Sequence, residues 1–431
     1  MSLLYNKKEG NDMFGISDKV VIGYDLSNKY AQISFCRLND DMPETITLLE
    51  GAEQYDIPTC LFKRSEVNQW FFGKEALSYS KLEEGTIIDN LLEQALIGDE
   101  IAVSDEYFNP IALLALYIKR SLSLVRNNVH TERICGIMFT VPDLTKRAIE
   151  VLNQVSVLLD LNDVTIQFQS REESIYRYMI HQASELWQYD VEVYDFSLDS
   201  MRSYHFYENE HTDPKVVFID ETLHKLNVRS DLEERDAAFL VIVKETTDER
   251  IVSCAYLIGD GFNGEWCKES LRELCKKRRA FRGNNLYSKG ACYSIRDKLI
   301  KKEISDKRIY LGRDKLKANI GMNVFRKGEK SYLALLNGGD SWYESKKECD
   351  IILCSGNRFS VIITPLDGRN IKTVEVELDG LPIREDRTTR LRINVFMESE
   401  DILRITATDM GFGEIIPSTN QVFTQQINLY E

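Results

Sequence analysis

Three turns that follow expected strands carry residue types suited to a phosphate group and its cation. Asp25 and Asp195 each end an apolar run, and Gly259-Asp260-Gly261 follows a third. Carboxylates can hold a hydrated magnesium ion, and glycine-containing turns can aim backbone N–H groups at phosphate oxygens. Each turn alone is weak evidence, because a strand-turn-strand carrying Asp is most often only a hairpin.

The segments that must position these turns alternate between strand and helix patterns up to about residue 302, which predicts an α/β layer architecture. Beyond that point, alternating strands and Asp-Gly turns predict a separate antiparallel β domain. The main strands are expected at 20–25, 30–35, 134–141, 164–168, 191–195, 216–219, 251–258, 373–378, 390–395 and 403–408, and the main helices at 110–127, 172–187 and 265–274.

Composition narrows the classes of partner. The chain has 431 residues, of which 54 are Lys or Arg and 69 are Asp or Glu, giving a net charge of −15. This balance disfavours tracking a nucleic-acid backbone. The nine scattered cysteines contain no CxxC pair and are expected to be reduced, and the five histidines lack zinc-ligand spacing. Without a long apolar run, no membrane association is expected, and the location is expected to be cytoplasmic.

In this order the motifs resemble those of the actin-like ATPase superfamily and, more closely, the DnaK-type heat-shock protein 70 chaperones. Residues 22–26 resemble the first phosphate loop, and 136–142 resemble the strand ending in Thr-Val-Pro. Glu172 falls at the Glu of the Asn-Glu-Pro motif. Residues 193–195 resemble the opening of the second phosphate loop, and 257–261 resemble the adenosine loop.

The resemblance continues toward the C-terminus. Gly290-Ala291 resembles the helix near the family's domain hinge. Residues 320–322 resemble the Leu-Gly-Ile opening of the peptide-binding β-sandwich, and 376–382 resemble one of its later strands and turns. The resemblance therefore implies an actin-like, ribonuclease H-like duplicated nucleotide-binding domain followed by an antiparallel β-sandwich.

The domain bounds follow from this assignment. We expect a flexible N-terminus over 1–18 and the nucleotide-binding-like domain over 19–302, with lobes of about 19–190 and 191–302. A connection over 303–318 leads to the sandwich at 319–431. The upper part of the second lobe is reduced, because Asp195 and Gly259 are separated by about half of what the resemblance implies, and the helical lid is expected to be absent.

The site residues implied by the resemblance form three groups. Asp25, Glu172 and Asp195 are the catalytic candidates, with Asp25 and Asp195 holding magnesium through water, although carboxylates that cap a turn or are paired in the cleft explain them equally well. The candidate contacts to ATP or ADP are Ser27, Asn28, Lys29, Ser197, Gly259, Asp260 and Gly261. Val361 lies where the family has a peptide-groove residue, but strand alternation alone makes it a core residue.

Departures from the family pattern bear on activity. Ser27, Asn28 and Lys29 stand where the first loop has Gly and two Thr, Leu77 stands where the catalytic Lys is expected, and residues 195–202 lack all three glycines of the second loop. Phosphoryl transfer depends on positioning and charge neutralisation, so these losses should cost many orders of magnitude in rate.

The sequence therefore predicts a chaperone-like protein-interaction module that binds an extended peptide or protein and has a degenerate, non-hydrolysing nucleotide cleft. The alternative is a divergent ATP-binding protein with slow magnesium-dependent hydrolysis, in which Lys29 replaces the missing lysine. A filament-forming actin relative is a third possibility, which the β-sandwich disfavours. The sequence does not define the oligomeric state.

Overall fold

The computed structural model of the protein divides into two compact units, residues 1–307 and 308–431. This division falls inside the expected connection 303–318. The described residues are 18–49, 53–65, 67–103, 106–127, 133–197, 200–209, 215–226, 231–276, 278–300, 308–366 and 370–429. The expected flexible N-terminus therefore lies, apart from residue 18, outside the described residues.

The first half of unit 1 is built on a mixed sheet. β1 (Val20–Leu26) is buried along its whole length and pairs antiparallel with β2 (Tyr30–Arg37), which pairs antiparallel with β3 (Glu44–Thr45). On its other side β1 pairs parallel with β10 (Ile134–Val141), followed by β11 (Thr165–Ser170), also parallel. Parallel strands covered on both faces read as continuous apolar runs, which is the pattern of β1 and β10.

The segment between β2 and β10 adds smaller elements. β4 (Ile57–Pro58) pairs with β2, and β5 (Leu61–Arg64) lies between β6 (Trp70–Phe72) and β7 (Gly85–Ile88). The remaining elements are α1 (Gly73–Tyr79), α2 (Leu91–Ile97), the paired β8 (Ile101–Val103) and β9 (Glu106–Phe108), α3 (Pro110–Leu122), and then α4 (Lys146–Leu159) and α5 (Arg171–Ile180).

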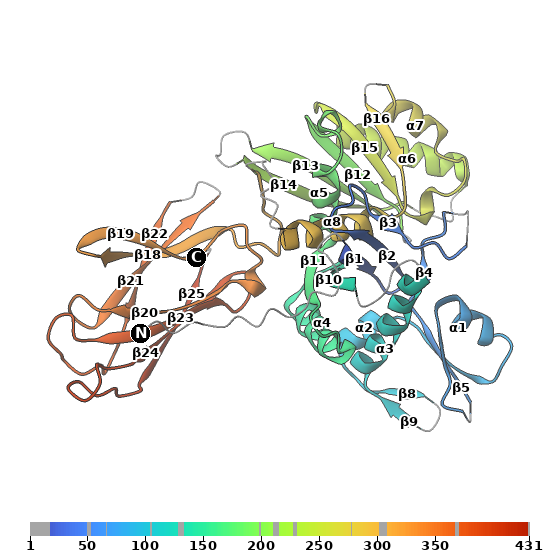
Figure 1. The fold of residues 1–431 in the computed structure, drawn as a ribbon. Helices are drawn as coiled ribbons and strands as arrows, with labels where there is room; N and C mark the ends of the chain where they lie inside the picture. The colour runs from blue at the N-terminus through green and yellow to red at the C-terminus, as the bar shows by residue number, and fades with distance from the viewer. Residues whose placement is uncertain are drawn as a thin grey trace. The chain divides into compact units, whose positions relative to one another are not determined.

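The second half of unit 1 repeats the same strand arrangement. β12 (Asp190–Asp195) pairs antiparallel with β13 (Met201–Asn209), which pairs antiparallel with β14 (Lys215–His224). On the other side of β12 lie β15 (Val252–Ile258) and β16 (Arg279–Arg282), both parallel. The order β3-β2-β1-β10-β11 is thus matched by β14-β13-β12-β15-β16 (Figure 1). Asp25, the last residue but one of β1, and Asp195, the last of β12, therefore lie at the same end of equivalent strands.

Two helices cover the second sheet: α6 (Leu232–Thr247) and α7 (Lys268–Leu274). The sequence patterns did not predict α6, since apolar residues occur around much of it: Phe239 and Val243 are buried whereas Val241 is 54% exposed. The expected helix over 172–187 ends earlier, at Ile180, and the helix expected from 265 begins at Lys268.

The last helix of unit 1, α8 (Leu286–Ile300), packs against both α5 and β1. The approach requires glycine on each contact: a Cβ at Gly23 would lie 2.0 Å from the carbonyl oxygen of Ser288, and one at Gly290 would lie 1.9 Å from that of Ser174. Because these are backbone atoms, they cannot move aside cheaply. Glycine therefore fixes α8 against the first sheet and the start of α5.

Unit 2 begins with β17 (Arg308–Tyr310) and contains two antiparallel four-stranded sheets. One has the order β19-β18-β21-β22, formed by β18 (Ala318–Arg326), β19 (Glu329–Leu336), β21 (Arg358–Pro365) and β22 (Lys372–Glu377). The other has the order β20-β23-β24-β25, formed by β20 (Lys346–Ile352), β23 (Arg390–Met397), β24 (Ile402–Asp409) and β25 (Val422–Asn428).

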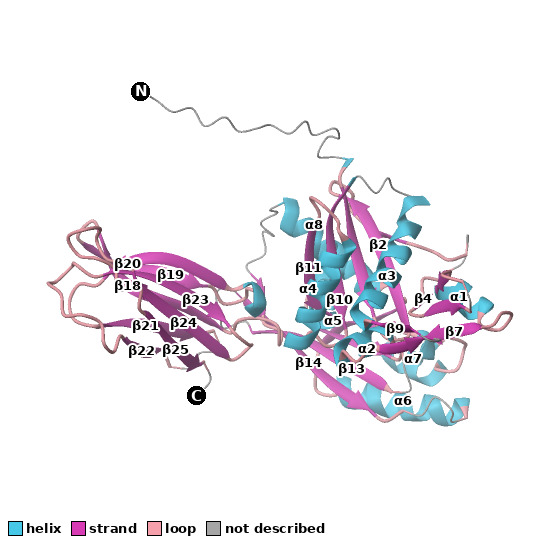
Figure 2. Cartoon of the chain, turned by 90° about the horizontal axis from the view of Figure 1, so that it is seen from below, coloured by secondary structure: helices cyan, strands magenta, loops and turns pink. Residues whose placement is uncertain are grey.

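Alternation of buried and less buried residues places the core of unit 2 on one face of each strand, as in Leu391, Ile393 and Val395 of β23. Figure 2 shows this unit almost wholly as strands and loops, with the long helices in unit 1. Over the described ranges of both units, no helix has the length and apolar character needed to span a bilayer.

Candidate functional site

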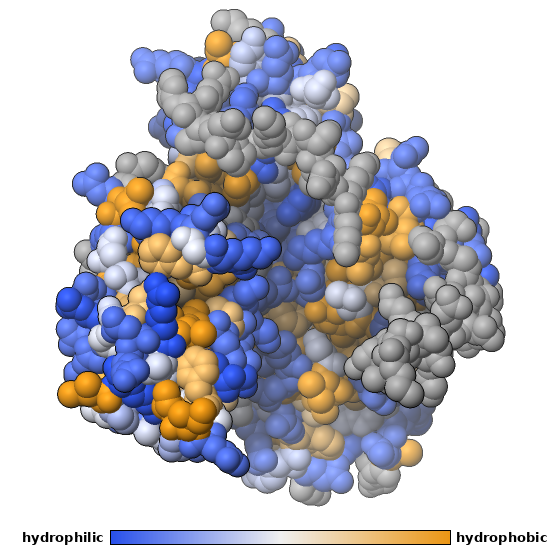
Figure 3. All heavy atoms as spheres, turned by 60° about the vertical axis from the view of Figure 1, so that its left-hand side comes forward, coloured by the Kyte–Doolittle hydropathy of each residue, from blue (hydrophilic) through white to orange (hydrophobic). Residues whose placement is uncertain are grey.

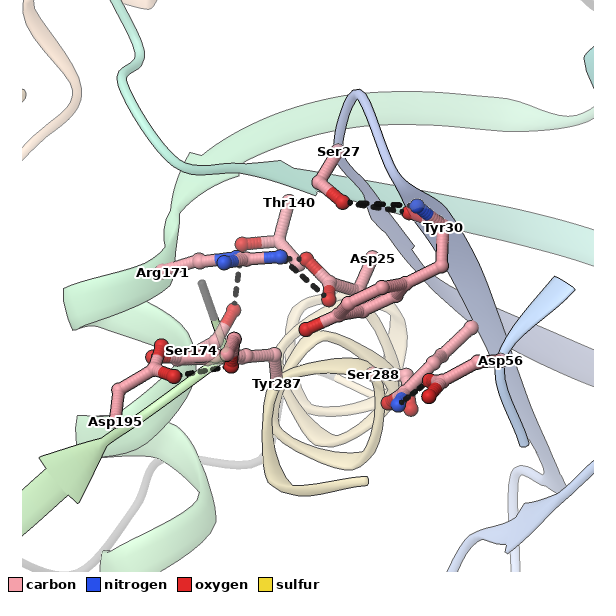
Figure 4. Close-up of polar contacts among 12 residues, drawn as sticks. Asp25, Ser27, Tyr30, Asp56, Thr140, Arg171, Ser174, Asp195, Tyr287 and Ser288 are labelled. Atoms are coloured by element: carbon pink, nitrogen blue, oxygen red, sulfur yellow. Dashed lines mark hydrogen bonds and ion pairs between the residues drawn. The ribbon is translucent and has the colours of Figure 1, made fainter. Parts of the chain in front are cut away.

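The carboxylate at the end of β1 is held by an arginine. Arg171 is the first residue of α5, directly after β11, and its Nε and Nη2 donate to Oδ1 and Oδ2 of Asp25, both at 3.0 Å. Asp25 is fully buried and Arg171 is 6% exposed. β1 and β11 flank β10 in a parallel set, so their carboxyl ends meet at one edge of the sheet. The result is a buried, bidentate ion pair (Figure 4).

The carboxylate at the end of β12 is held by hydroxyl groups. Tyr287 of α8 donates from its phenol to Oδ2 of Asp195 at 2.6 Å, and Ser197 donates its hydroxyl to Oδ1. The Tyr287 ring also lies against the guanidinium of Arg171, with 4.5 Å between Cζ and the ring centroid. Figure 4 shows Tyr287 between Arg171 and Asp195. Through α8, one tyrosine therefore connects the first half of unit 1 with the second.

Burial governs the protonation of this network. It raises the pKa of Asp25, while the Arg171 guanidinium opposes that rise. Burial alone would lower the pKa of Arg171, but Asp25 above all holds it well above its usual value. Burial, followed by the charge of Asp195, raises the pKa of Tyr287 far above that of a free phenol. At neutral pH, Tyr287 is thus a neutral donor, and Arg171 is a fixed cation.

Of the three predicted carboxylates, Asp25 and Asp195 lie in the same network. A different residue of α5 contacts Asp25 in place of the predicted Glu172. Arg171, and not Glu172, contacts Asp25. Glu172 instead acts electrostatically on Tyr204 of β13, together with Asp195. The reason is the helix start: Ser170 caps α5 by accepting from the backbone N–H of Glu173, which makes Arg171 its first residue.

The predicted first loop uses its polar groups within the protein. Ser27 donates its hydroxyl to the carbonyl of Tyr30 at 2.8 Å, and Asn28 accepts at Oδ1 from the backbone N–H of Glu93 at 2.9 Å. Burial raises the pKa of Asp260, and the positive charge of Lys29 opposes that rise. Lys29 is therefore within electrostatic reach of the predicted adenosine loop.

The two glycines of the predicted adenosine loop allow it to pack closely against residues 196–197, which belong to the predicted second phosphate loop. Gly259 has a φ of +98°, and a Cβ there would lie 2.6 Å from the backbone nitrogen of Ser197. Gly261 donates its N–H to the carbonyl of Phe196 at 2.8 Å, and a Cβ on it would lie 2.4 Å from that oxygen. Residues 259–261 and 196–197 thus lie backbone against backbone. This accounts for both glycines without a phosphate.

The residues at the ends of β1 and β12 do not fit a magnesium ion with a bound nucleoside triphosphate. Both oxygens of Asp25 bind a guanidinium, and both oxygens of Asp195 accept hydrogen bonds from Ser197 and Tyr287. A fixed cation against Asp25 opposes a second cation by like-charge repulsion. Among the described residues, no group of three His, Cys, Asp or Glu side chains is arranged to hold a metal ion.

Sequence reasoning missed Arg171 and Tyr287. A signal for Arg171 was present, because Ser170-Arg171-Glu172-Glu173 has the Ser-x-x-Glu form of a helix capping box. It marks Ser170 as the cap and places a cation in the first turn, where the helix dipole disfavours it. No local signal marks Tyr287, since its partners are distant in the sequence.

Unit 2 contains a groove of about 620 Å³. Its wall includes residues of β18, the end of β20 and the start of β21, among them Phe325, Ile352 and Ile362. Val361, the predicted groove residue, is fully buried and is not part of this lining. Its neighbours Ser360 and Ile362 line the groove instead, because successive side chains of a strand point to opposite faces.

Comparison with known proteins gives family matches for both units. Residues 315–429 match a domain of unknown function (DUF8552). No curated protein matches the chain. Residues 42–313, more than half of the 431, match the C-terminal model of a family of unknown function (DUF5716). The chain therefore belongs to the DUF5716 family.

Proposed function

We propose that the protein is a chaperone-like protein-interaction module whose first unit does not hydrolyse nucleotide. The observation that carries the proposal is the bidentate ion pair of Arg171 with Asp25, since it occupies the carboxylate that a magnesium ion would need. Unit 1 then serves as a scaffold, and recognition of a partner falls to unit 2.

The strand arrangement supports an actin-like fold for unit 1. Each half has three antiparallel strands followed by two parallel ones, which agrees with a duplicated ribonuclease H-like fold. The two four-stranded sheets of unit 2 agree with a chaperone-type β-sandwich. Fold analogy alone does not give a function, so the proposal depends on the site.

The alternative, slow magnesium-dependent ATP hydrolysis, requires Asp25 to release Arg171. Removing one partner of a buried ion pair costs about 3–5 kcal/mol, because the other charge is left uncompensated. Magnesium would also have to compete with the hydroxyl of Tyr287 for Asp195. The network thus favours the scaffold function over the enzymatic one.

The groove of unit 2 is the candidate site for an extended partner segment. It combines exposed apolar side chains with polar ones such as Asn323 and Ser360. On the face of the molecule in Figure 3, hydrophobic side chains stand in small patches among hydrophilic ones.

The test is suppression of aggregation. A heat-unfolded enzyme is followed by light scattering with the full chain, with and without magnesium-ATP. We expect the chain to lower the scattering equally in both conditions. A chain that leaves scattering unchanged, or that acts only while it hydrolyses ATP, would refute the proposal.

A further inference from the structure

Two strands of the first sheet in unit 2 separate from one another and leave facing backbone edges. β18 and β21 pair from Ala318 opposite Pro365 to Gly321 opposite Ile362. From there on, among the described residues, β18 continues paired with β19 as far as Arg326, and β21 continues paired with β22 as far as Arg358. The groove lies in this fork, since residues 322–326 and 358–360 line it.

The chain that enters β21 lies along one side of the fork. β20 belongs to the second sheet, and its continuation at Leu353 donates its N–H to the carbonyl of Thr389. The turn that follows reaches Gly356, whose φ is +72°, before β21 begins in the first sheet. The crossing from one sheet to the other thus forms a wall of the groove at Asp350–Ser355.

The groove offers apolar contacts to what enters it. Phe325 is 60% exposed and Ile352 is 52% exposed, and both line the groove together with the less exposed Ile362. An unpaired strand edge beside exposed apolar side chains is a template for another strand. The geometry therefore favours an extended segment with alternating apolar side chains.

The charges at the groove favour an acidic segment. Arg326 is exposed and makes no ion pair with another described residue. Arg358 pairs with Glu375 at the surface, with both side chains exposed. Asp350, the carboxylate among the described residues that line the groove, is held by two hydrogen bonds from Arg392, which also lower its pKa. Arg326 is thus the charged lining residue that a carboxylate of an entering segment could pair with, although the whole chain carries −15.

We propose that an extended, acidic segment of a partner protein enters this fork and pairs as an added strand with the free edge of β18 at residues 322–326. The inference rests on the proposed function in that unit 2 binds a partner. It specifies the occupant by its chemistry: apolar side chains at alternate positions, carboxylates between them, and a free backbone.

The probe is a fluorescent (Val-Glu)5 peptide titrated with the full chain and read by anisotropy. The acidic peptide should bind at least about tenfold more tightly than (Val-Lys)5. Because alternate N–H groups of a strand face the same neighbour, N-methylation of one alternate set of residues should weaken binding by about tenfold and that of the other set should not. Equal binding of both charge types, or insensitivity to both N-methylated sets, would overturn the proposal.

Protein variants locate the site. Phe325→Ser and Ile352→Ser should each weaken (Val-Glu)5 binding by about tenfold through lost apolar contact. Ile415→Ser is the matched control, since Ile415 is 92% exposed in the same unit and is not part of the groove lining. Arg326→Glu should weaken (Val-Glu)5 and strengthen (Val-Lys)5, a reversal that misfolding cannot produce. Loss of binding in the control and retention in the groove variants would contradict the assignment.

Failure of this inference is distinguishable from failure of the proposed function. If the peptide does not bind the fork but the chain still suppresses aggregation without ATP, the protein-interaction function stands and its site lies elsewhere. If the chain acts on the unfolded enzyme only during ATP hydrolysis, the proposed function fails whatever the peptide does.

Discussion

The guanidinium of Arg171 holds both oxygens of a carboxylate that has no access to water. Such a pair contributes little net stability as a unit, because desolvation of both charges offsets their attraction. Loss of one partner is expensive, since the remaining charge stays buried. The contribution of the Arg171–Asp25 pair to stability is therefore best measured by replacing each residue separately and then both together.

We expect Arg171→Met to lower the free energy of unfolding by about 3–5 kcal/mol and Arg171→Met/Asp25→Asn to recover much of that loss. Urea unfolding followed by circular dichroism measures both. Arg272→Met is the control in the same unit: Arg272 pairs with Glu269 at the surface, with the two side chains 74% and 59% exposed, so its loss should change stability by less than about 1 kcal/mol. If Arg171→Met and Arg272→Met lowered the free energy of unfolding equally, this would show that the Asp25 pair is not buried in solution.

A second buried charge cluster makes stability depend on pH. His205 of β13 lies 2.5 Å from Glu192 through Nδ1 and 3.3 Å from Asp190 through Nε2. Burial alone would lower the pKa of His205, but the hydrogen bonds to Asp190 and Glu192 outweigh it and raise the pKa to about 9, with Arg250 opposing them. The neighbouring Tyr207 stacks on the imidazole.

Because the folded pKa is raised, the protonated imidazole stabilises the fold fully below its unfolded value near 6.5, and this contribution disappears as the pH rises through about 9. We expect His205→Gln to destabilise the chain by about 1–3 kcal/mol at pH 6, and the difference from wild type to shrink between pH 6.5 and 9. Unfolding curves across this range check it. A difference that stays constant or grows with pH would mean that His205 is not charged in the fold.

At the scale of elements, α8 carries Tyr287 to both carboxylates, and its position depends on two glycine contacts. Gly290→Ala would place a Cβ 1.9 Å from the carbonyl oxygen of Ser174, so α8 must shift away from α5. We expect a loss of stability of at least about 2 kcal/mol, measured by thermal unfolding.

Gly283→Ala is the matched control, because no atom lies within 4 Å of a Cβ built there and its φ is not in the left-handed range. That change should be neutral or slightly stabilising, since alanine restricts the unfolded chain. If both glycine changes have the same small effect, α8 is not held against α5 as described.

The elements also show what the sequence could predict. The ends of β1 and β12 were predictable because a continuous apolar run followed by a polar turn is typical of a buried strand. Arg171 was missed because the expected strand stopped at Phe168 and the expected helix began at Glu172, so the helix start was shifted by a single residue. Successive residues of a helix point about 100° apart, so a shift of one residue places the guanidinium of Arg171 at the site in place of the carboxylate of Glu172.

Tyr287 and α6 were beyond sequence reasoning for a different reason. Tyr287 lies 92 positions from Asp195, and only the packing of α8 brings them together. The residues of α6 have no single apolar face, so tertiary contacts with the second sheet decide that this segment is a helix. In unit 2, the alternation of β23 and β24 was plain, but the fork between β18 and β21 depends on a register that alternation does not define.

At the scale of the whole molecule, each unit has its own core and its own candidate chemistry. Unit 1 keeps a closed, internally paired network at the ends of β1 and β12, and unit 2 has an open groove beside free strand edges. We infer a division between a scaffold that needs no nucleotide and a binding unit. We propose that Arg171 takes the place of a bound cation at Asp25.

The most direct test is calorimetric titration of the full chain with magnesium-ATP, in parallel for wild type, Asp25→Ala and Arg171→Met. We predict no saturable heat for the wild type up to about 1 mM nucleotide, which corresponds to a binding free energy weaker than about −4 kcal/mol. Saturable binding by the wild type at lower concentration that disappears in Asp25→Ala would contradict the claim, because it would mean that Asp25 serves a nucleotide despite Arg171.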